Sequence, residues 1–261
     1  MATKKDVPVA RKTDVGVALD FAADAGRGLE GADKASFAIP FLVVLQSNSP
    51  QLETISGAKA GMFLNSVTDE LFDKVRVVPV AFQRRYLAWA PRTAGGGFKG
   101  EHTVAEVEGA GNPLKWERKP DHNGSMQMTM PDGSILKDTR NHFVLALGAN
   151  NSTMQALFSF SSTQVKKSKR WMSRIQSIEL KDAKGAIYNP PSFSHIYECT
   201  TANEENDKGK WKGVVINLIG PVQDAGLYAS AKHFHGLIVA GKIETAAPPT
   251  GQEDDDGSNK F

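Results

Sequence analysis

Apolar and polar positions along the 261-residue chain predict a mostly β protein with a few helices. The strongest strand signal covers residues 74–90, which are rich in β-branched and aromatic side chains. Pro79 within this run predicts an edge position or a bulge, and a strand of this length has to bend. The Pro-Asp-Gly-Ser sequence at 131–134 predicts a hairpin turn. Further strands are predicted at 126–130, 142–147, 154–160, 195–200 and 211–219.

Two segments have the pattern of helices. One begins after Ser161-Ser162-Thr163, which are favourable N-cap residues, and continues to about Ser177. The other covers about 225–240. Several strands with one interposed helix and one helix near the end favour a mostly β (α+β) fold. A five-stranded oligonucleotide/oligosaccharide-binding (OB) barrel, elaborated with helices and long loops, has this order. Pattern alone leaves an open α+β sheet as an alternative.

Composition fits a protein with an apolar core and no membrane span. Apolar residues make up 40% of the chain, and no apolar run approaches the roughly 20 residues that cross a bilayer. The basic residues near Met1 are not followed by the apolar stretch of a secretory signal. The single cysteine, Cys199, excludes an internal disulfide and a cysteine-built zinc site, so we expect it to be buried in a strand. We therefore expect a cytoplasmic protein, located in the host cytoplasm if a phage encodes it.

The net charge of +2 conceals an uneven distribution. Residues 1–36, predicted to be a mobile arm, carry six basic and six acidic side chains. Residues 37–243, the predicted OB-like nucleic-acid-binding domain, carry 24 basic and 18 acidic side chains. Residues 244–261, predicted to be a disordered acidic tail, have a net charge of −4. A basic body with an acidic tail is typical of proteins that bind nucleic acid.

The tail ends in Glu-Asp-Asp-Asp-Gly-Ser-Asn-Lys-Phe, residues 253–261. It resembles the tail of bacterial and phage single-stranded-DNA-binding proteins, an acidic disordered segment with a terminal Phe. This resemblance covers only the last nine residues, and Asn259-Lys260 stand where the bacterial pattern has Ile-Pro. It implies that the tail recruits replication partners such as polymerase or helicase and competes with DNA for the basic groove. The residues expected to contact such a partner are Asp254, Asp255, Asp256 and Phe261.

The first candidate DNA-binding segment lies at the end of the strongest strand and in the Gly-rich loop after it. Alternation on a strand puts Arg84 and Tyr86 on one face and Arg85 and Trp89 on the other. Single-stranded DNA needs this mixture, because bases stack on aromatic rings and phosphates pair with cations. Burial of either aromatic residue in the core is the competing interpretation. The candidate contacts here are Arg84, Arg85, Tyr86, Trp89, Arg92, Phe98 and Lys99.

The second candidate is the predicted helix that follows Thr163, where five cations and one Trp occur within nine residues. No acidic residue follows until Glu179, which favours an anionic partner, although a solvated basic helix face is the alternative. Weaker groups at 115–119 and 208–212 also pair Trp with Lys or Arg. The candidate contacts on the helix are Lys166, Lys167, Lys169, Arg170, Trp171 and Arg174.

Signals for enzymatic chemistry are poor. The chain has no phosphate-binding Gly-x-x-x-x-Gly-Lys-Ser/Thr loop and no Gly-x-Ser-x-Gly elbow, and His233-x-His235 has no nearby acidic or Cys partner. Asp132, Glu179 and Lys181 match a loose Pro-Asp…Glu-x-Lys signature of metal-dependent nucleases. We expect no catalytic residue, no cofactor and no metal, and keep a nuclease or recombination enzyme as an alternative.

The leading hypothesis is a single-stranded-DNA-binding protein, without sequence preference, that acts in phage DNA replication, recombination or repair. Its expected partners are single-stranded DNA and, through the tail, replication proteins, with no membrane contact. A homo-oligomer is compatible with the sequence. A phage structural or interaction protein, whose basic patches meet another protein, is the third alternative.

Overall fold

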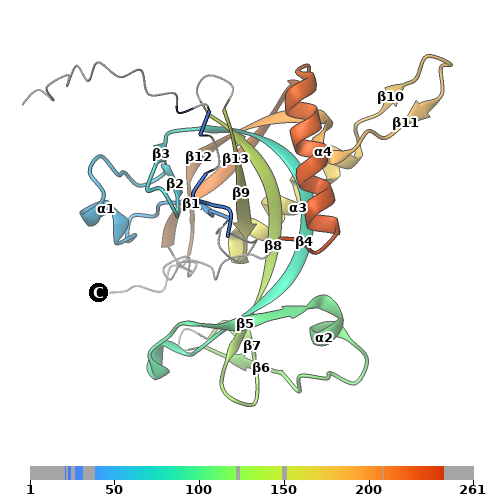
Figure 1. Ribbon diagram of the computed structural model, residues 1–261. Helices are drawn as coiled ribbons and strands as arrows, with labels where there is room; N and C mark the ends of the chain where they lie inside the picture. The colour runs from blue at the N-terminus through green and yellow to red at the C-terminus, as the bar shows by residue number, and fades with distance from the viewer. Residues whose placement is uncertain are drawn as a thin grey trace, which may run out of the picture. The chain divides into compact units, whose positions relative to one another are not determined.

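The computed structural model of the chain divides into two compact units, residues 1–37 and 38–261 (Figure 1). In the first unit, the few described residues form turns, with an exposed ion pair between Asp24 and Arg27 at 2.7 Å. The predicted acidic tail at 244–261 lies outside the described residues, as does most of the predicted arm. The structure describes residues 21, 23–24, 27–31, 39–121, 124–148, 152–207 and 209–243, without the side chain of Arg92.

The second unit is built around an eight-stranded antiparallel sheet. The strand order is β13-β12-β4-β8-β7-β6, with β5 paired to β4 and β9 paired to β8. The strands are β4 (Val75–Trp89), β5 (Phe98–Thr103), β6 (Glu117–Pro120), β7 (Met126–Thr129), β8 (Ile135–Leu147), β9 (Thr153–Phe160), β12 (His195–Asn206) and β13 (Gly209–Pro221).

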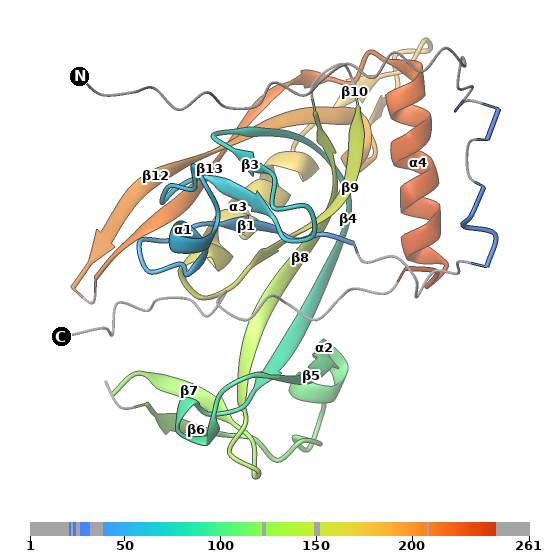
Figure 2. The same ribbon diagram turned by 60° about the vertical axis from the view of Figure 1, so that its left-hand side comes forward.

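The two longest-paired strands, β4 and β8, connect two parts of this unit. They pair from Arg76 opposite Leu147 to Trp89 opposite Ile135, with a register shift between Pro79 and Ala81. This shift is the bulge that Pro79 predicts, since proline cannot donate to a regular ladder. Both strands curve out of the body of the sheet into a lobe formed by β5, β6, β7 and α2 (Figures 1 and 2).

The remaining elements are short, apart from two helices. The three-stranded sheet β1-β2-β3 is antiparallel, and β10 and β11 form a separate hairpin. The predicted helices are present as α3 and α4. These elements are α1 (Gln51–Thr54), α2 (Val104–Glu108), α3 (Val165–Gln176), α4 (Ala225–Val239), β1 (Leu42–Val44), β2 (Phe63–Asn65), β3 (Leu71–Phe72), β10 (Leu180–Lys181), β11 (Ile187–Tyr188), η2 (Arg92–Ala94), η4 (Ser162–Gln164) and η5 (Ser192–Ser194).

Helices α3 and α4 cover opposite faces of the sheet. Trp171 of α3 packs in a buried cluster with Val144, whereas Phe234 of α4 packs in another with Phe143. Adjacent residues of a strand point to opposite faces, so β8 is buried on both sides. Asp224 caps α4 by accepting a hydrogen bond from Leu227 N at 2.6 Å. A third cluster, around Tyr86, fills the lobe.

The predicted mostly β, α+β class is confirmed. The predicted five-stranded barrel is not formed: the described strands make an open eight-stranded sheet, with β13 and β6 as separate ends of the strand order. The open sheet was the alternative that pattern left available. Cys199 is fully buried in β12, as predicted. None of the helices in the described part of the chain is long and apolar enough to span a bilayer.

Candidate nucleic-acid interface

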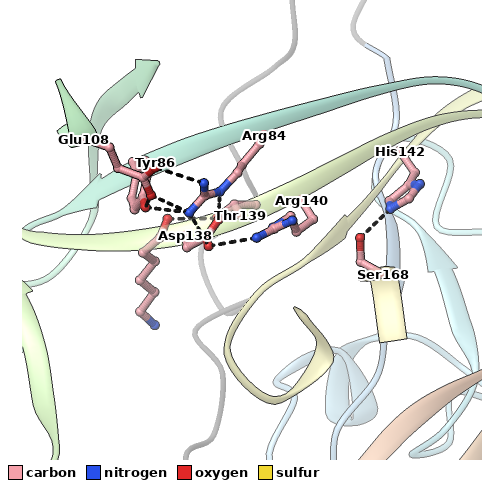
Figure 3. A network of polar contacts seen from close by, with 9 residues as sticks. Arg84, Tyr86, Glu108, Asp138, Thr139, Arg140, His142 and Ser168 are labelled. Carbon is pink, nitrogen blue, oxygen red and sulfur yellow. Dashed lines mark hydrogen bonds and ion pairs between the residues drawn. The ribbon is translucent and has the colours of Figure 1, made fainter. Parts of the chain in front are cut away.

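The cations of the first candidate segment whose side chains are described are engaged in the protein's own contacts. Arg84 forms two hydrogen bonds with Asp138, both at 2.9 Å, and two with Glu108, at 2.6 and 3.2 Å. Tyr86 accepts a hydrogen bond from Arg84 at 2.7 Å and donates its own proton to Glu108. Arg140 adds a contact to Asp138 at 3.3 Å (Figure 3). This Arg84 network joins β4, β8 and α2.

The protonation states in the Arg84 network follow from these contacts. The hydrogen bonds that Arg84 donates to Asp138 raise the pKa of Arg84, and the bonds that Glu108 accepts from Tyr86 and Arg84 lower the pKa of Glu108. Burial alone would raise the pKa of Asp138, but hydrogen bonds from Arg84 and Arg140 bring it below its usual value. Burial, followed by the bond to Glu108, raises the pKa of Tyr86. The network therefore holds two carboxylates, two guanidinium groups and a neutral phenol, which match one another in charge.

The other described side chains of this segment are also paired or packed against neighbours. The Arg85 guanidinium reaches Glu101 at 3.4 Å and the Arg84 carbonyl at 3.1 Å. Trp89 is buried and lies edge-on to Phe98, with ring centroids 5.6 Å apart. Lys99 pairs with Asp132 at 3.0 Å on the surface. Tyr86 and Trp89, on opposite faces of β4, are both buried, so the competing core interpretation describes them correctly.

Helix α3, the second candidate, buries one side of its surface against the sheet. Trp171 is 2% exposed and stacks on His142 of β8, with ring centroids 4.6 Å apart and 21° between the planes. His142 Nε2 and Ser168 Oγ are hydrogen-bonded at 2.7 Å (Figure 3). Burial, with a smaller effect of the Arg140 charge, lowers the pKa of His142 to about 3, so the ring is neutral at physiological pH. The predicted stacking residue Trp171 thus belongs to the core.

The outer side of α3 carries cations without partners. Lys166, Lys169 and Arg170 are exposed, and none forms an ion pair or hydrogen bond with any residue that the structure describes. Lys169 and Arg170 follow Lys166 by three and four residues, so the three side chains share one side of the helix. We call these three residues the α3 ridge. The helix has no acidic residue to neutralise it.

A pocket of about 260 Å³ separates α3 from β13. Within it, Arg174 donates to the Ile216 carbonyl at 3.0 Å, and Lys167 pairs with Glu204. These two predicted contacts are therefore partly engaged, unlike the α3 ridge. The pocket is lined by Lys167, Arg170, Trp171, Arg174 and Val214–Asn217.

The Trp residues of the two weaker groups donate hydrogen bonds within the protein. Trp116 donates its indole N–H to the Val107 carbonyl at 2.8 Å and packs in the lobe cluster. Trp211 donates to Glu204 at 3.0 Å, the same carboxylate that Lys167 contacts.

The residues of the nuclease signature do not come together. Asp132 sits in the β7–β8 turn, where Gly133 has φ of 84° and Ser134 donates two hydrogen bonds to the carboxylate, at 2.8 and 2.9 Å. These bonds and Lys99 lower the pKa of Asp132 to about 2. Lys181 lies in β10 and Glu179 directly precedes it, and the β10–β11 hairpin is at the opposite end of the second unit (Figures 1 and 2). Across the described residues, no three His, Cys, Asp or Glu side chains gather as metal ligands.

Comparison with known proteins gives one match. The family model of the Pam3 phage gp34-like protein matches residues 9–244. The chain belongs to this phage protein family. The gp34-like match spans the whole sheet and both long helices, and it ends at residue 244, where the predicted acidic tail begins. No curated protein and no solved structure matches the chain.

Sequence reasoning missed a second pocket, on the other side of α3, which residues from β4, β8, η5 and α4 complete. Its members are far apart in the sequence, and no local motif marks them. The predicted partner contacts Asp254, Asp255, Asp256 and Phe261, and the side chain of Arg92, lie outside what the structure describes.

Proposed function

We propose that this gp34-like protein binds single-stranded DNA, without sequence preference, along the outer side of α3. The observation that carries the proposal is the α3 ridge: Lys166, Lys169 and Arg170 are exposed and have no counter-charge among the described residues. Phosphates of a strand lying along the helix would supply that counter-charge. The proposed role is in phage DNA replication or recombination.

The contrast with the first candidate segment supports this choice. Arg84 already makes four hydrogen bonds to carboxylates, so a phosphate would have to displace them. The three residues of the α3 ridge displace only water and counterions when they contact a phosphate. Release of counterions drives such binding and makes it weaker in salt.

The flanks of the ridge extend the proposed footprint. Arg170 and Arg174 line the pocket between α3 and β13, which has room for a phosphate or sugar beside the helix. Trp171 is left out of the footprint, because its ring is buried against His142. In this proposal the acidic tail recruits a replication partner and competes with DNA for the ridge.

The test is fluorescence anisotropy of a labelled oligo(dT) titrated with the full-length chain at several salt concentrations. The variant Lys166→Gln/Lys169→Gln/Arg170→Gln removes the ridge charges. Each lost phosphate contact on a single strand lowers the salt slope by about 0.7, so the triple variant is expected to lower it by about 2. Its affinity at low salt falls accordingly.

A matched control removes three exposed cations elsewhere, with Lys59→Gln/Lys184→Gln/Lys232→Gln. The net charge change is the same, so the control separates a local contact from long-range attraction. We expect the control to bind nearly as the parent chain does. Absence of binding by the parent chain at low salt, or equal losses in the two triple variants, would refute the proposal. The first result would favour a protein-contact role for the ridge.

A further inference from the structure

Strand β4 has an open edge in its middle. On the side away from β8, β12 pairs only with Val75–Val77, and β5 pairs only with Arg85–Trp89. Residues 78–84 therefore have no strand neighbour on this side within the described part of the protein. Ser192 of η5 covers one position by donating its hydroxyl to the Val80 carbonyl at 3.2 Å. Residues 79–83 of this edge line a pocket.

This pocket, the β4-edge pocket, has a volume of about 380 Å³ and lies between α3 and α4. Its walls are largely apolar, with Met172 and Ile175 from α3 and Ile238 and Val239 from α4. The full lining is Pro79, Val80, Ala81, Phe82, Gln83, His142, Met172, Ile175, Ser192, His235, Ile238 and Val239.

Aromatic faces and free polar groups coexist in the β4-edge pocket. Phe82 lies against His142, with ring centroids 5.0 Å apart. The Gln83 amide and the His235 ring have no hydrogen-bond partner among the residues described. A planar ligand could therefore be held between apolar side chains and bonded at its polar edge by the Gln83 amide.

One residue of the α3 ridge, Lys169, lies beside this pocket. Lys169 precedes Met172 by three residues, so the two side chains lie on the same side of the helix, one exposed and one lining the pocket. Val239, on the opposite wall, is 71% exposed and lies at the opening. A phosphate at Lys169 would place its own nucleotide next to an apolar, partly aromatic cavity.

We infer that the β4-edge pocket receives a nucleobase of the strand whose phosphates contact the α3 ridge. This inference rests on the proposed DNA binding and deepens it. The ridge supplies affinity for any polyanion, whereas the pocket makes binding depend on bases. Gln83 and His235 contact the polar edge of the base, and Phe82 and Met172 contact its face.

The experiment compares two labelled oligomers of about 12 nucleotides, within the length that one single-strand site covers. One is oligo(dT), and the other has the same backbone with abasic sugars. Stacking of one base changes affinity by about fivefold or more, so the parent chain is expected to bind oligo(dT) tighter by at least that factor. Val239→Trp places a large side chain at the pocket mouth. It is expected to abolish this preference and leave the affinity for the abasic strand unchanged.

Ala229→Trp, at an exposed position of α4 outside the pocket, is the matched control and should keep the preference. Gln83→Leu keeps the pocket filled but removes the amide, and should reduce the preference part of the way. Equal binding of the two oligomers by the parent chain would refute base binding in the pocket and leave the proposed phosphate contacts of the ridge standing. A preference that survives Val239→Trp would place base contacts elsewhere. No binding of either oligomer would refute both base binding in the pocket and the proposed DNA binding.

Discussion

The buried His142 ring should make the stability of the fold depend on pH. His142 is 1% exposed, bonded to Ser168 and stacked on Trp171, and its pKa is lowered to about 3. In the unfolded chain the pKa returns to about 6.5. Between these two values the unfolded state binds a proton that the folded state excludes. The stability that this ring contributes is therefore present above pH 6.5 and is lost as the pH falls.

The size of the effect follows from the two pKa values. The free energy of unfolding falls by about 1.4 kcal/mol for each pH unit below the pKa of the unfolded state, as long as the folded ring stays neutral. From pH 7 to pH 5 this amounts to about 2 kcal/mol, and any folded pKa below about 4 gives the same figure. His142→Gln keeps a polar group opposite Ser168 and removes the titration. It should be less stable than the parent at pH 7, and this gap should shrink by about 2 kcal/mol at pH 5.

The assay is urea unfolding of the parent and His142→Gln at pH 7 and pH 5, followed by circular dichroism. The pKa of His195 is also lowered by burial, but this residue is present in both proteins and cancels in the difference. His233→Gln, at an exposed position on α4, is the control and should follow the parent at both pH values. If His142→Gln loses as much stability on acidification as the parent does, the buried ring is not the titrating group and the reasoning fails.

Two further predictions separate structure from binding. Arg84→Ala should lower stability by about 2 kcal/mol, because it removes four charge-assisted hydrogen bonds from the Glu108 and Asp138 carboxylates, and should leave oligo(dT) affinity unchanged. Urea unfolding measures the first effect and fluorescence anisotropy the second. Weaker DNA binding by a stably folded variant would show that Arg84 contributes to the DNA interface. A chain ending at Gln252 should bind oligo(dT) more tightly than the full chain at low salt, since the competing acidic tail is gone. Equal affinities in that titration would mean that the tail does not compete for the ridge.

Strand β4 and the two long helices were predictable because their local pattern and their tertiary role agree, whereas β8 and β12 extend beyond the predicted 142–147 and 195–200. The prediction of a strand at 74–90 matches β4 closely, including the bulge at Pro79, and both long helices lie where their periodicity puts them. In the lobe, β7 was predicted at 126–130, but β5 and β6 were not. All four residues of β6 are exposed, and β5 contains Gly100 and buries none of its side chains fully. These strands therefore form because their backbones pair with β7 and β4, not because their own side chains enter a core.

The candidate interface was predictable only as a list of cations. Sequence density marks both Arg84 and Lys166, but Arg84 finds its partners 24 and 54 residues away, at Glu108 and Asp138. The β4-edge pocket brings together Gln83 and His235, which are far apart in the sequence. Such long-range contacts leave no trace in local spacing, so no reading of the sequence would distinguish paired from unpaired cations.

The unpaired state of the α3 ridge is itself an energetic argument. Lys166 and Arg170 are four residues apart, as are Arg170 and Arg174, and like charges at this spacing destabilise a helix by about 0.2–0.5 kcal/mol per pair. The Arg84 network shows that this chain supplies carboxylates where cations are held inside the protein. Along the α3 ridge the described residues supply none, so the repulsion between its cations persists at an outward-facing surface. A solvated helix that served only to cover Trp171 and His142 would be more stable with a Glu at any of these outer positions. A polyanion lying along the ridge removes the repulsion, so the charge pattern favours a helix whose outer side is completed by a ligand.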